Sequence, residues 1–264
     1  MPYVKVGPAT LHYRQAGSGE RVLLLFHAFP LHSGMWDAQL AAFAAEGWRV
    51  IAPDARGFGK SSVAPDVLGM DVIADDAAAV LDSLQVTRAV IGGLSMGGYA
   101  AFELWRRRKD LVRALLLADT KAAADTADGA AARESFAKKA VTKGAAWVAA
   151  ELAPKLQRPE RLASVDLALH SMIAGTLPAA IAAGSRGLAR RADKTPTLAT
   201  IDVPARIVVG SADALTPPAD AKSMSSAIRG STLVEIPNAG HLANLEDPDA
   251  FAAAVIPWLR ELPR

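Results

Sequence analysis

The pattern of apolar and polar positions predicts strands near the start of the chain. The segments "YVKV" and "LHYRQ" alternate around Gly7-Pro8, which is typical of a β-hairpin. The segment "RVLLLFHAF", residues 21–29, is a continuous apolar run, as expected of a strand that is buried on both faces. Residues 35–48 then show helical spacing that ends near Gly47.

Strands and helices alternate regularly as far as residue 119. The expected strands are residues 49–54, 88–93 and 112–119, and the expected helices are residues 71–84, with Asp71 as the N-cap, and 99–107. This alternation predicts an α/β fold with a parallel, doubly wound sheet and helices on both of its faces.

The pattern changes between residues 120 and 200. This segment is rich in alanine and charged residues, and stretches such as "ARESFAKKAV" and "RLASVDLALHSMI" predict short helices rather than strands. The alternation resumes with "PARIVVGSAD" and "STLVEIPNAGH". We therefore expect a core made of residues 1–119 and 201–264, with residues 120–200 inserted as a helical cap, or lid, over the edge of the sheet.

Composition and charge narrow the classes of function. The formal net charge is only +2, and the one basic cluster, Arg106 to Lys109, falls at an expected helix C-terminus, so we expect no binding to nucleic acid. The chain has no cysteine, which excludes disulfides and thiolate chemistry. The N-terminus does not resemble a signal peptide, and no apolar run reaches the ~18–20 residues of a membrane span. We expect a cytoplasmic protein without membrane association.

One short motif carries chemical information. The sequence Gly93-Leu94-Ser95-Met96-Gly97 lies where an expected strand gives way to an expected helix. A G-x-S-x-G motif in this context is typical of a nucleophile elbow, in which small neighbours permit a sharp turn and the helix N-terminus favours developing negative charge. The alternative is a glycine-rich turn that serves only close packing of the strand and the helix.

A serine hydroxyl needs a base, and the base needs an orienting carboxylate. His241 is the best of the five histidines because it lies in a polar loop after the last apolar strand. Asp213 follows the strand "RIVVG" and is the expected acid, with Asp119 at the end of an earlier strand as its rival. The chain order Ser95, Asp213, His241 is the order found in α/β-hydrolases.

An oxyanion hole requires two N–H donors. We assign one to Met96, directly after the serine, and the other to Phe29, in the loop after the strand 21–26. Pro30 has no N–H, but its fixed φ stiffens the residue before it.

With these residues in place, the chain resembles the α/β-hydrolase superfamily, and most closely its bacterial carboxylesterase, 3-oxoadipate enol-lactonase and cofactor-free haloperoxidase (perhydrolase) branch. The resemblance rests on "LLLFHAFPLHSGMWDAQ", "RVIAPDARGFGKSS", "IGGLSMGGYAAFE", "PARIVVGSAD" and "IPNAGHLANLEDPDAF". It implies a mostly parallel eight-stranded sheet with a helical cap. Ala28 stands where similar proteins usually carry glycine, which bears on the shape of the oxyanion loop.

The combined motifs predict a serine hydrolase that cleaves small to medium carboxylic esters through an acyl-enzyme, without a metal or an organic cofactor. The alternatives are an enol-lactonase or a C–C bond hydrolase on the same residues, or a non-catalytic ligand receptor on a hydrolase fold. The Phe29-Pro30 pair also resembles the perhydrolase loop and suggests a peracid-forming side activity. The expected substrate pocket is lined by Trp36, Phe136, Trp147, Met172 and Leu177.

Overall fold

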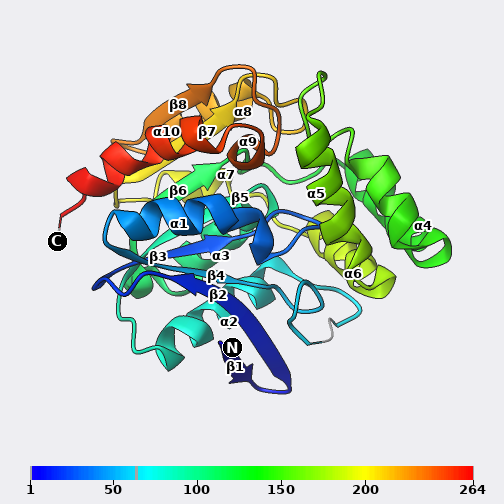
Figure 1. Cartoon of the computed structure of the whole chain (residues 1–264), viewed down its shortest axis with the longest axis horizontal. Coiled ribbons are helices and arrows are strands. Elements are labelled where there is room, and N and C mark those ends of the chain that lie inside the picture. Colours follow the sequence, from blue (N-terminus) through cyan, green and yellow to red (C-terminus); the bar gives the residue numbers. More distant parts are fainter. Residues whose placement is uncertain (1, 63–64, 264) are drawn as a thin grey trace.

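The computed structural model describes residues 2–62 and 65–263, and its centre is an eight-stranded sheet (Figure 1). The strand order is β1-β2-β4-β3-β5-β6-β7-β8. The strands are β1 (Tyr3–Val6), β2 (Ala9–Ala16), β3 (Arg21–Phe26), β4 (Trp48–Pro53), β5 (Ala89–Leu94), β6 (Val112–Ala118), β7 (Ala205–Gly210) and β8 (Thr232–Ile236). The prediction of a mostly parallel eight-stranded sheet is confirmed.

The pairing of the strands explains their apolar sequences. β1 and β2 form the predicted antiparallel hairpin, β2 pairs antiparallel with β4, and the remaining neighbours are parallel. Every residue of β5 is buried, because helices cover both faces of a central parallel strand. The carboxyl ends of the parallel strands therefore meet at one edge of the sheet, and the loops that follow them can assemble a site there.

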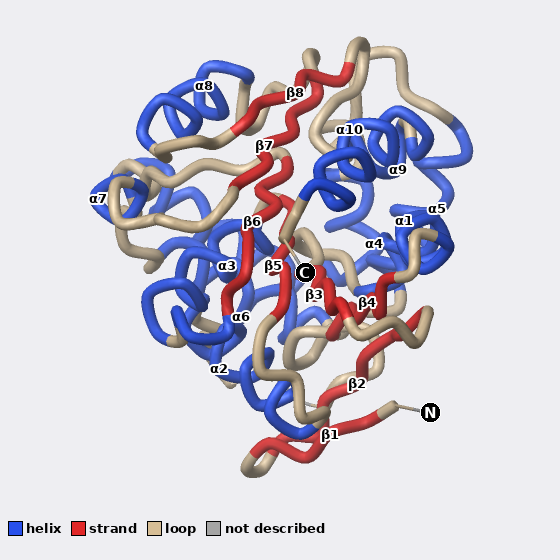
Figure 2. The backbone as a smooth tube through the Cα atoms, turned by 90° about the vertical axis from the view of Figure 1, so that its left-hand side faces the viewer, coloured by secondary structure: helices blue, strands red, loops and turns tan. Residues whose placement is uncertain are grey.

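Helices pack on both faces of the sheet, as Figure 2 shows from the side. α1 (Asp37–Ala45) and α10 (Pro248–Glu261) lie on one face, and α2 (Met70–Ser83), α3 (Met96–Arg107) and α8 (Pro218–Ala227) lie on the other. The predicted cap at Asp71 is wrong: α2 has Gly69 as its N-cap, and Asp71 lies within the first turn.

Four helices lie between β6 and β7 in the sequence. They are α4 (Ala127–Leu152), α5 (Ala163–Ala174), α6 (Pro178–Ala189) and the short α7 (Thr195–Leu198). α4, α5 and α6 lie together at one side of the sheet (Figure 1), and α4 packs against both of the others. α4 is interrupted at Gly144, whose φ of 82° is readily adopted only by glycine.

Two short 3-10 helices and one more short helix complete the fold. η1 (Ser33–Trp36) and η2 (Lys109–Leu111) precede α1 and β6, and α9 (Ala243–Glu246) follows the loop that carries His241. Among the described residues, no single helix has the length and apolarity to cross a membrane, although the bent pair α5 and α6 passes that test by length and composition alone.

Candidate active site

Ser95 occupies a strained turn between β5 and α3. Its φ of 55° and ψ of −112° lie in a region that side-chain-bearing residues seldom adopt. The surrounding structure holds the turn in place, because the N–H of Ser95 donates to the carbonyl of Ala118 in β6 at 3.0 Å and the hydroxyl of Thr120 donates to the Ser95 carbonyl at 2.8 Å. The serine is thus fixed at the N-terminus of α3.

The flanking glycines are required by close backbone contacts. A Cβ on Gly93 would lie 2.2 Å from the carbonyl of Gly97, and a Cβ on Gly97 would lie 2.4 Å from the carbonyl oxygen of Phe26. Neither distance is possible for a real side chain, so both positions need glycine. The turn can form only with small residues two positions before and two positions after Ser95.

His241 and Asp213 are in direct contact. Asp213 follows β7 and His241 follows β8, and the distance between His241 Nδ1 and Asp213 Oδ2 is 2.8 Å. Both side chains are buried. A proton on Nδ1 that is donated to Asp213 leaves Nε2 as the acceptor, which is the tautomer that a general base requires.

Asp213 is itself held by several donors. Its Oδ1 accepts from the backbone N–H groups of Leu215 and Thr216, and its Oδ2 accepts from the Thr216 hydroxyl at 2.7 Å. Burial acts to raise the pKa of Asp213, but the charge of His241 and these hydrogen bonds outweigh it, and the pKa lies below its ordinary value. Asp213 therefore carries its charge at neutral pH.

Asp119, the rival acid, has a different environment. It lies at the end of β6, completely buried, and its Oδ1 accepts from the N–H of Gly210 at 2.7 Å. Its Oδ2 has no hydrogen-bond partner among the described residues. Burial and the neighbouring charge of Asp213 raise the pKa of Asp119 well above its ordinary value, so the site favours the protonated form of this carboxyl.

The two residues assigned to the oxyanion hole come from two separate segments of the chain. Met96 is the first residue of α3, and Phe29 lies in the loop after β3. Neither backbone N–H has an acceptor within the part of the chain that the structure describes. Both donors are therefore available to a ligand. The side chain of Phe29 lines the cavity in front of Ser95, whereas that of Met96 is buried elsewhere.

The side chain of His27 holds the loop after β3 by two hydrogen bonds. Its Nε2 accepts from the N–H of Ala55 at 3.0 Å, so Nδ1 carries the proton and donates to the Ala28 carbonyl at 2.9 Å. Burial lowers the pKa of His27, which keeps the ring neutral. Ala28 does not adopt a positive φ, so the alanine that replaces the glycine of similar proteins fits this loop without strain.

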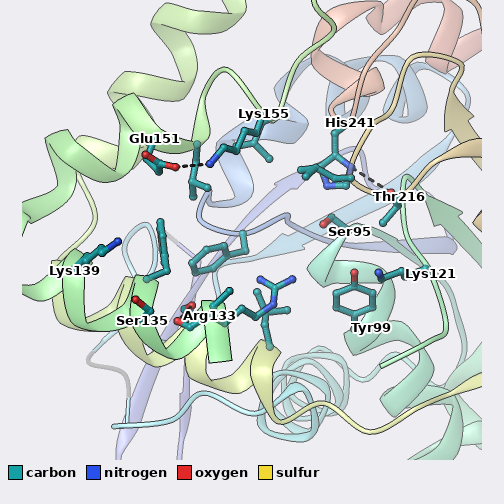
Figure 3. Close-up of a pocket in the computed structure, with 18 of the residues that line it drawn as sticks. Ser95, Tyr99, Lys121, Arg133, Ser135, Lys139, Glu151, Lys155, Thr216 and His241 are labelled. Carbon is teal, nitrogen blue, oxygen red and sulfur yellow. Dashed lines mark hydrogen bonds and ion pairs between the residues drawn. The ribbon is translucent and has the colours of Figure 1, made fainter. Parts of the chain in front are cut away.

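Ser95 and His241 open into one cavity of about 580 Å³ (Figure 3). One wall comes from the loops after β3, β5, β6, β7 and β8, and the other comes from α4 and α6. Of the pocket residues predicted from the sequence, Phe136 and Trp147 line this cavity, with their ring centroids 5.4 Å apart.

The structure places the other three predicted pocket residues outside the cavity. Trp36 is fully buried in the core, where its Nε1 donates to the Phe26 carbonyl and its ring packs against Phe251. Met172 is half-buried against the hydrophobic core, and Leu177 is 63% exposed at the surface beside a separate small pocket.

Several polar residues of the cavity were not predicted from the sequence. They include Tyr99, Lys121, Arg133 and Thr216. Two of them could have been identified from their spacing in the sequence. Tyr99 lies one helical turn after Ser95, and Thr216 lies three residues after Asp213, within reach of its carboxylate. Among the described residues, no group of three or more histidine, aspartate or glutamate side chains is arranged to hold a metal ion.

Asp125 organises the charges beside the cavity. Its carboxylate contacts the Nε of Arg133 and the Nη1 of Arg191, the latter at 2.7 Å. Burial acts to raise the pKa of Asp125, but the hydrogen bonds and charges of the two arginines lower it from 3.8 to about 2. Asp125 is therefore ionised at neutral pH.

This lowered pKa predicts a pH-dependent effect of the substitution Asp125→Asn. A folded-state pKa below the unfolded value adds stability that is present above pH ~4 and is lost as the pH falls toward about 2. Urea unfolding should show a clear loss of stability for Asp125→Asn at pH 7 and a much smaller loss near pH 2.5. An equal loss at both pH values would contradict the ion-pair explanation.

Comparison with known proteins identifies the family of the chain. A family model described as "alpha/beta hydrolase fold" matches residues 21–248. The chain is 30% identical to 3-oxoadipate enol-lactonase 2 of Acinetobacter baylyi over 250 residues, which cover 93% of this chain and 91% of the relative.

Two solved structures are also similar. A thermophilic esterase from Thermogutta terrifontis with malate bound has a TM-score of 0.94 and 35% identity over 99% of both chains. The enol-lactonase from Burkholderia xenovorans has a TM-score of 0.91 and 29% identity, over 98% of this chain and all of that one.

Proposed function

Because the chain belongs to the α/β-hydrolase family, we propose that it is a serine hydrolase that cleaves carboxylic esters of small to medium size through an acyl-enzyme intermediate. One observation carries the proposal: Ser95, at a strained turn, and His241, held by Asp213, line the same cavity. The esterase and enol-lactonase relatives support hydrolytic chemistry of this kind.

The mechanism follows from the roles that these groups can take. Nε2 of His241 removes the proton from Ser95 Oγ as the oxygen attacks the ester carbonyl, and Asp213 stabilises the resulting imidazolium. The N–H groups of Phe29 and Met96 donate to the oxyanion of the tetrahedral intermediate. His241 then gives its proton to the departing alcohol, which leaves Ser95 acylated. A water molecule deprotonated by His241 releases the acid and restores the serine.

The insertion supplies the second wall of the site. We propose that residues 120–200 form a cap over the core, because Arg133, Phe136 and Trp147 of α4 line the cavity that also contains Ser95. A volume of about 580 Å³ suits a small-molecule ester rather than a polymer. The aromatic rings of Phe29, Phe136 and Trp147 provide apolar surface for the substrate's carbon chain.

An enol-lactonase is the second candidate function. The specific observation in its favour is the 30% identity to 3-oxoadipate enol-lactonase 2 over 93% of this chain. Lactone opening would use the same serine, base and oxyanion donors, since a lactone is a cyclic ester. The shape and polarity of the substrate therefore distinguish the two activities, while the catalytic residues do not.

The proposal is tested by covalent labelling together with turnover. A fluorophosphonate should add once, to the peptide that contains Ser95, as seen by mass spectrometry, and the protein should hydrolyse 4-nitrophenyl butyrate. An unlabelled and inactive protein would favour the ligand-receptor alternative. A labelled protein that fails on linear esters but opens an enol-lactone would favour the lactonase.

A further inference from the structure

The lining of the cavity carries an excess of positive charge. Its charged side chains are Lys121, Arg133, Lys139, Lys155 and Glu151. Glu151 is paired with Lys155, so this pair contributes no net charge. The whole chain has a formal net charge of only +2, so the excess is a property of this cavity and not of the protein as a whole.

Lys121 is held close to the nucleophile by its backbone. The segment before it is tied to Ser95 by the Ala118 carbonyl and the Thr120 hydroxyl, and the carbonyl of Ala122 accepts from the N–H of Lys194 at 2.9 Å. The Lys121 side chain lies beside Tyr99 at the end of the cavity near Ser95 (Figure 3). Within residues 2–62 and 65–263, no carboxylate lies within 4.0 Å of its ammonium group.

Arg133 approaches the same space from the insertion. Only its Nε is engaged by Asp125, so its two Nη groups remain available, and Figure 3 shows the guanidinium turned toward Tyr99 and Ser95. Asp125 also pairs with Arg191, whose guanidinium carbon lies 4.4 Å from the centre of the Tyr99 ring. A single carboxylate thus serves two guanidinium groups, and a positive charge is left over.

Tyr99 adds a hydroxyl donor between the two cations. The residue is 5% exposed, and its oxygen has no hydrogen-bond partner in the part of the chain that the structure describes. Burial raises the pKa of Tyr99, although the charges of Arg191 and Arg133 oppose this, so the phenol keeps its proton and can donate it. The charges of Asp125 and Asp220 also act to raise the pKa of Tyr99, and neither carboxylate lines the cavity.

We propose that the substrate is an ester that carries a second, free carboxylate, and that Lys121, Arg133 and the Tyr99 hydroxyl bind this carboxylate beside Ser95. The inference rests on the proposed ester hydrolysis and specifies its substrate class. A guanidinium, an ammonium and a phenol together offer charge-assisted hydrogen bonds to both oxygens of a carboxylate. A neutral ester would leave the two cations partly desolvated and uncompensated.

The test compares esters that differ only by replacement of a terminal methyl group with a carboxylate. One pair, 4-nitrophenyl pentanoate and 4-nitrophenyl hydrogen glutarate, places the charge on the acyl half. The other pair, pentyl acetate and 5-acetoxypentanoate, places it on the alcohol half and is followed by pH-stat titration. In at least one pair, the wild-type kcat/KM should favour the anionic ester by about tenfold or more.

Substitutions then identify the residues that recognise the charge. Lys121→Met and Arg133→Gln should each reduce the ratio of anionic to neutral kcat/KM by about tenfold, mainly through KM, because the carboxylate contact is present in both ground and transition states. Lys121→Arg should retain the preference. Lys138→Met is the matched control: it also removes one cation from α4, but Lys138 does not line the cavity, so the ratio should stay at the wild-type value.

The possible outcomes distinguish the proposed ester hydrolysis from the proposed recognition of a free carboxylate. Turnover of the esters without preference for the anionic member of either pair would overturn this inference and leave the proposed function standing. A preference that persists unchanged in both Lys121→Met and Arg133→Gln would also overturn it. Absence of turnover for all four esters would overturn the proposed function, and this inference with it.

Discussion

The substitution Ser95→Ala is expected to lower kcat for ester hydrolysis by at least about 10,000-fold. The hydroxyl oxygen is the atom that forms the acyl-enzyme, so no other group of the cavity can replace it in that step. The oxyanion donors of Phe29 and Met96 would remain and account for any residual rate above that in water. The measurement is the initial rate of 4-nitrophenyl butyrate hydrolysis per mole of folded protein, with the concentration of both proteins taken from their absorbance at 280 nm.

The structure of the variant should be unchanged. The strained backbone of residue 95 is set by hydrogen bonds of its own N–H and C=O groups, and neither depends on the hydroxyl. Circular dichroism and thermal unfolding should therefore match the wild type closely. Ser226→Ala, at an exposed position of α8, is the matched control and should retain full activity. Substantial turnover by a folded Ser95→Ala protein would remove Ser95 from the mechanism.

The sequence was sufficient to predict the elbow and the loops around it, because their requirements are local. Glycine is needed at positions 93 and 97 because a Cβ there would lie less than 2.5 Å from neighbouring backbone atoms. This requirement appears in the sequence as the G-x-S-x-G motif. The approach of His241 and Asp213 followed from topology, since the loops after parallel strands gather at one edge of the sheet.

The residues that line the cavity could be predicted only in part, because they depend on which face of each inserted helix points toward the core. In an alanine-rich helix the hydrophobic pattern does not single out one face, so Phe136 and Trp147 could not be separated from Met172 and Leu177. The break at Gly144 changes the direction of α4 within the segment that supplies Arg133 and Trp147. Trp36 belongs to the core because, at the end of η1, its buried ring packs against Phe251.

The pKa shifts of Asp119 and Asp213 likewise could not be predicted from the sequence. Asp119 and Asp213 both follow strands of the sheet, and both have the residue type that an orienting acid requires. Only the structure shows that hydrogen-bond donors surround Asp213, while Asp119 has a buried oxygen without a partner. The pKa of the same residue type is therefore shifted in opposite directions at the two positions, by burial and by neighbouring donors.

The substitution Asp213→Asn is expected to lower kcat/KM by about 10,000-fold, whereas Asp119→Asn should lower it by less than about tenfold. An asparagine at position 213 cannot stabilise the imidazolium of His241, and its amide group can favour the wrong tautomer of the ring. An asparagine at position 119 resembles the protonated carboxyl that burial favours and can still accept from Gly210 N–H. The kcat/KM for 4-nitrophenyl butyrate, measured at neutral pH for both variants, tests the difference.

The two variants should also differ in stability, which provides a second and independent measurement. The folded protein keeps a proton on Asp119 that the unfolded chain releases above its ordinary pKa of 3.8, so this residue lowers stability as the pH rises above that value. Asparagine does not titrate and avoids this effect. Urea unfolding at pH 7 should therefore show Asp119→Asn to be at least as stable as the wild type, while Asp213→Asn, which loses a charged acceptor for several donors, should be less stable. An inactive Asp119→Asn beside an active Asp213→Asn would transfer the role of orienting acid to Asp119.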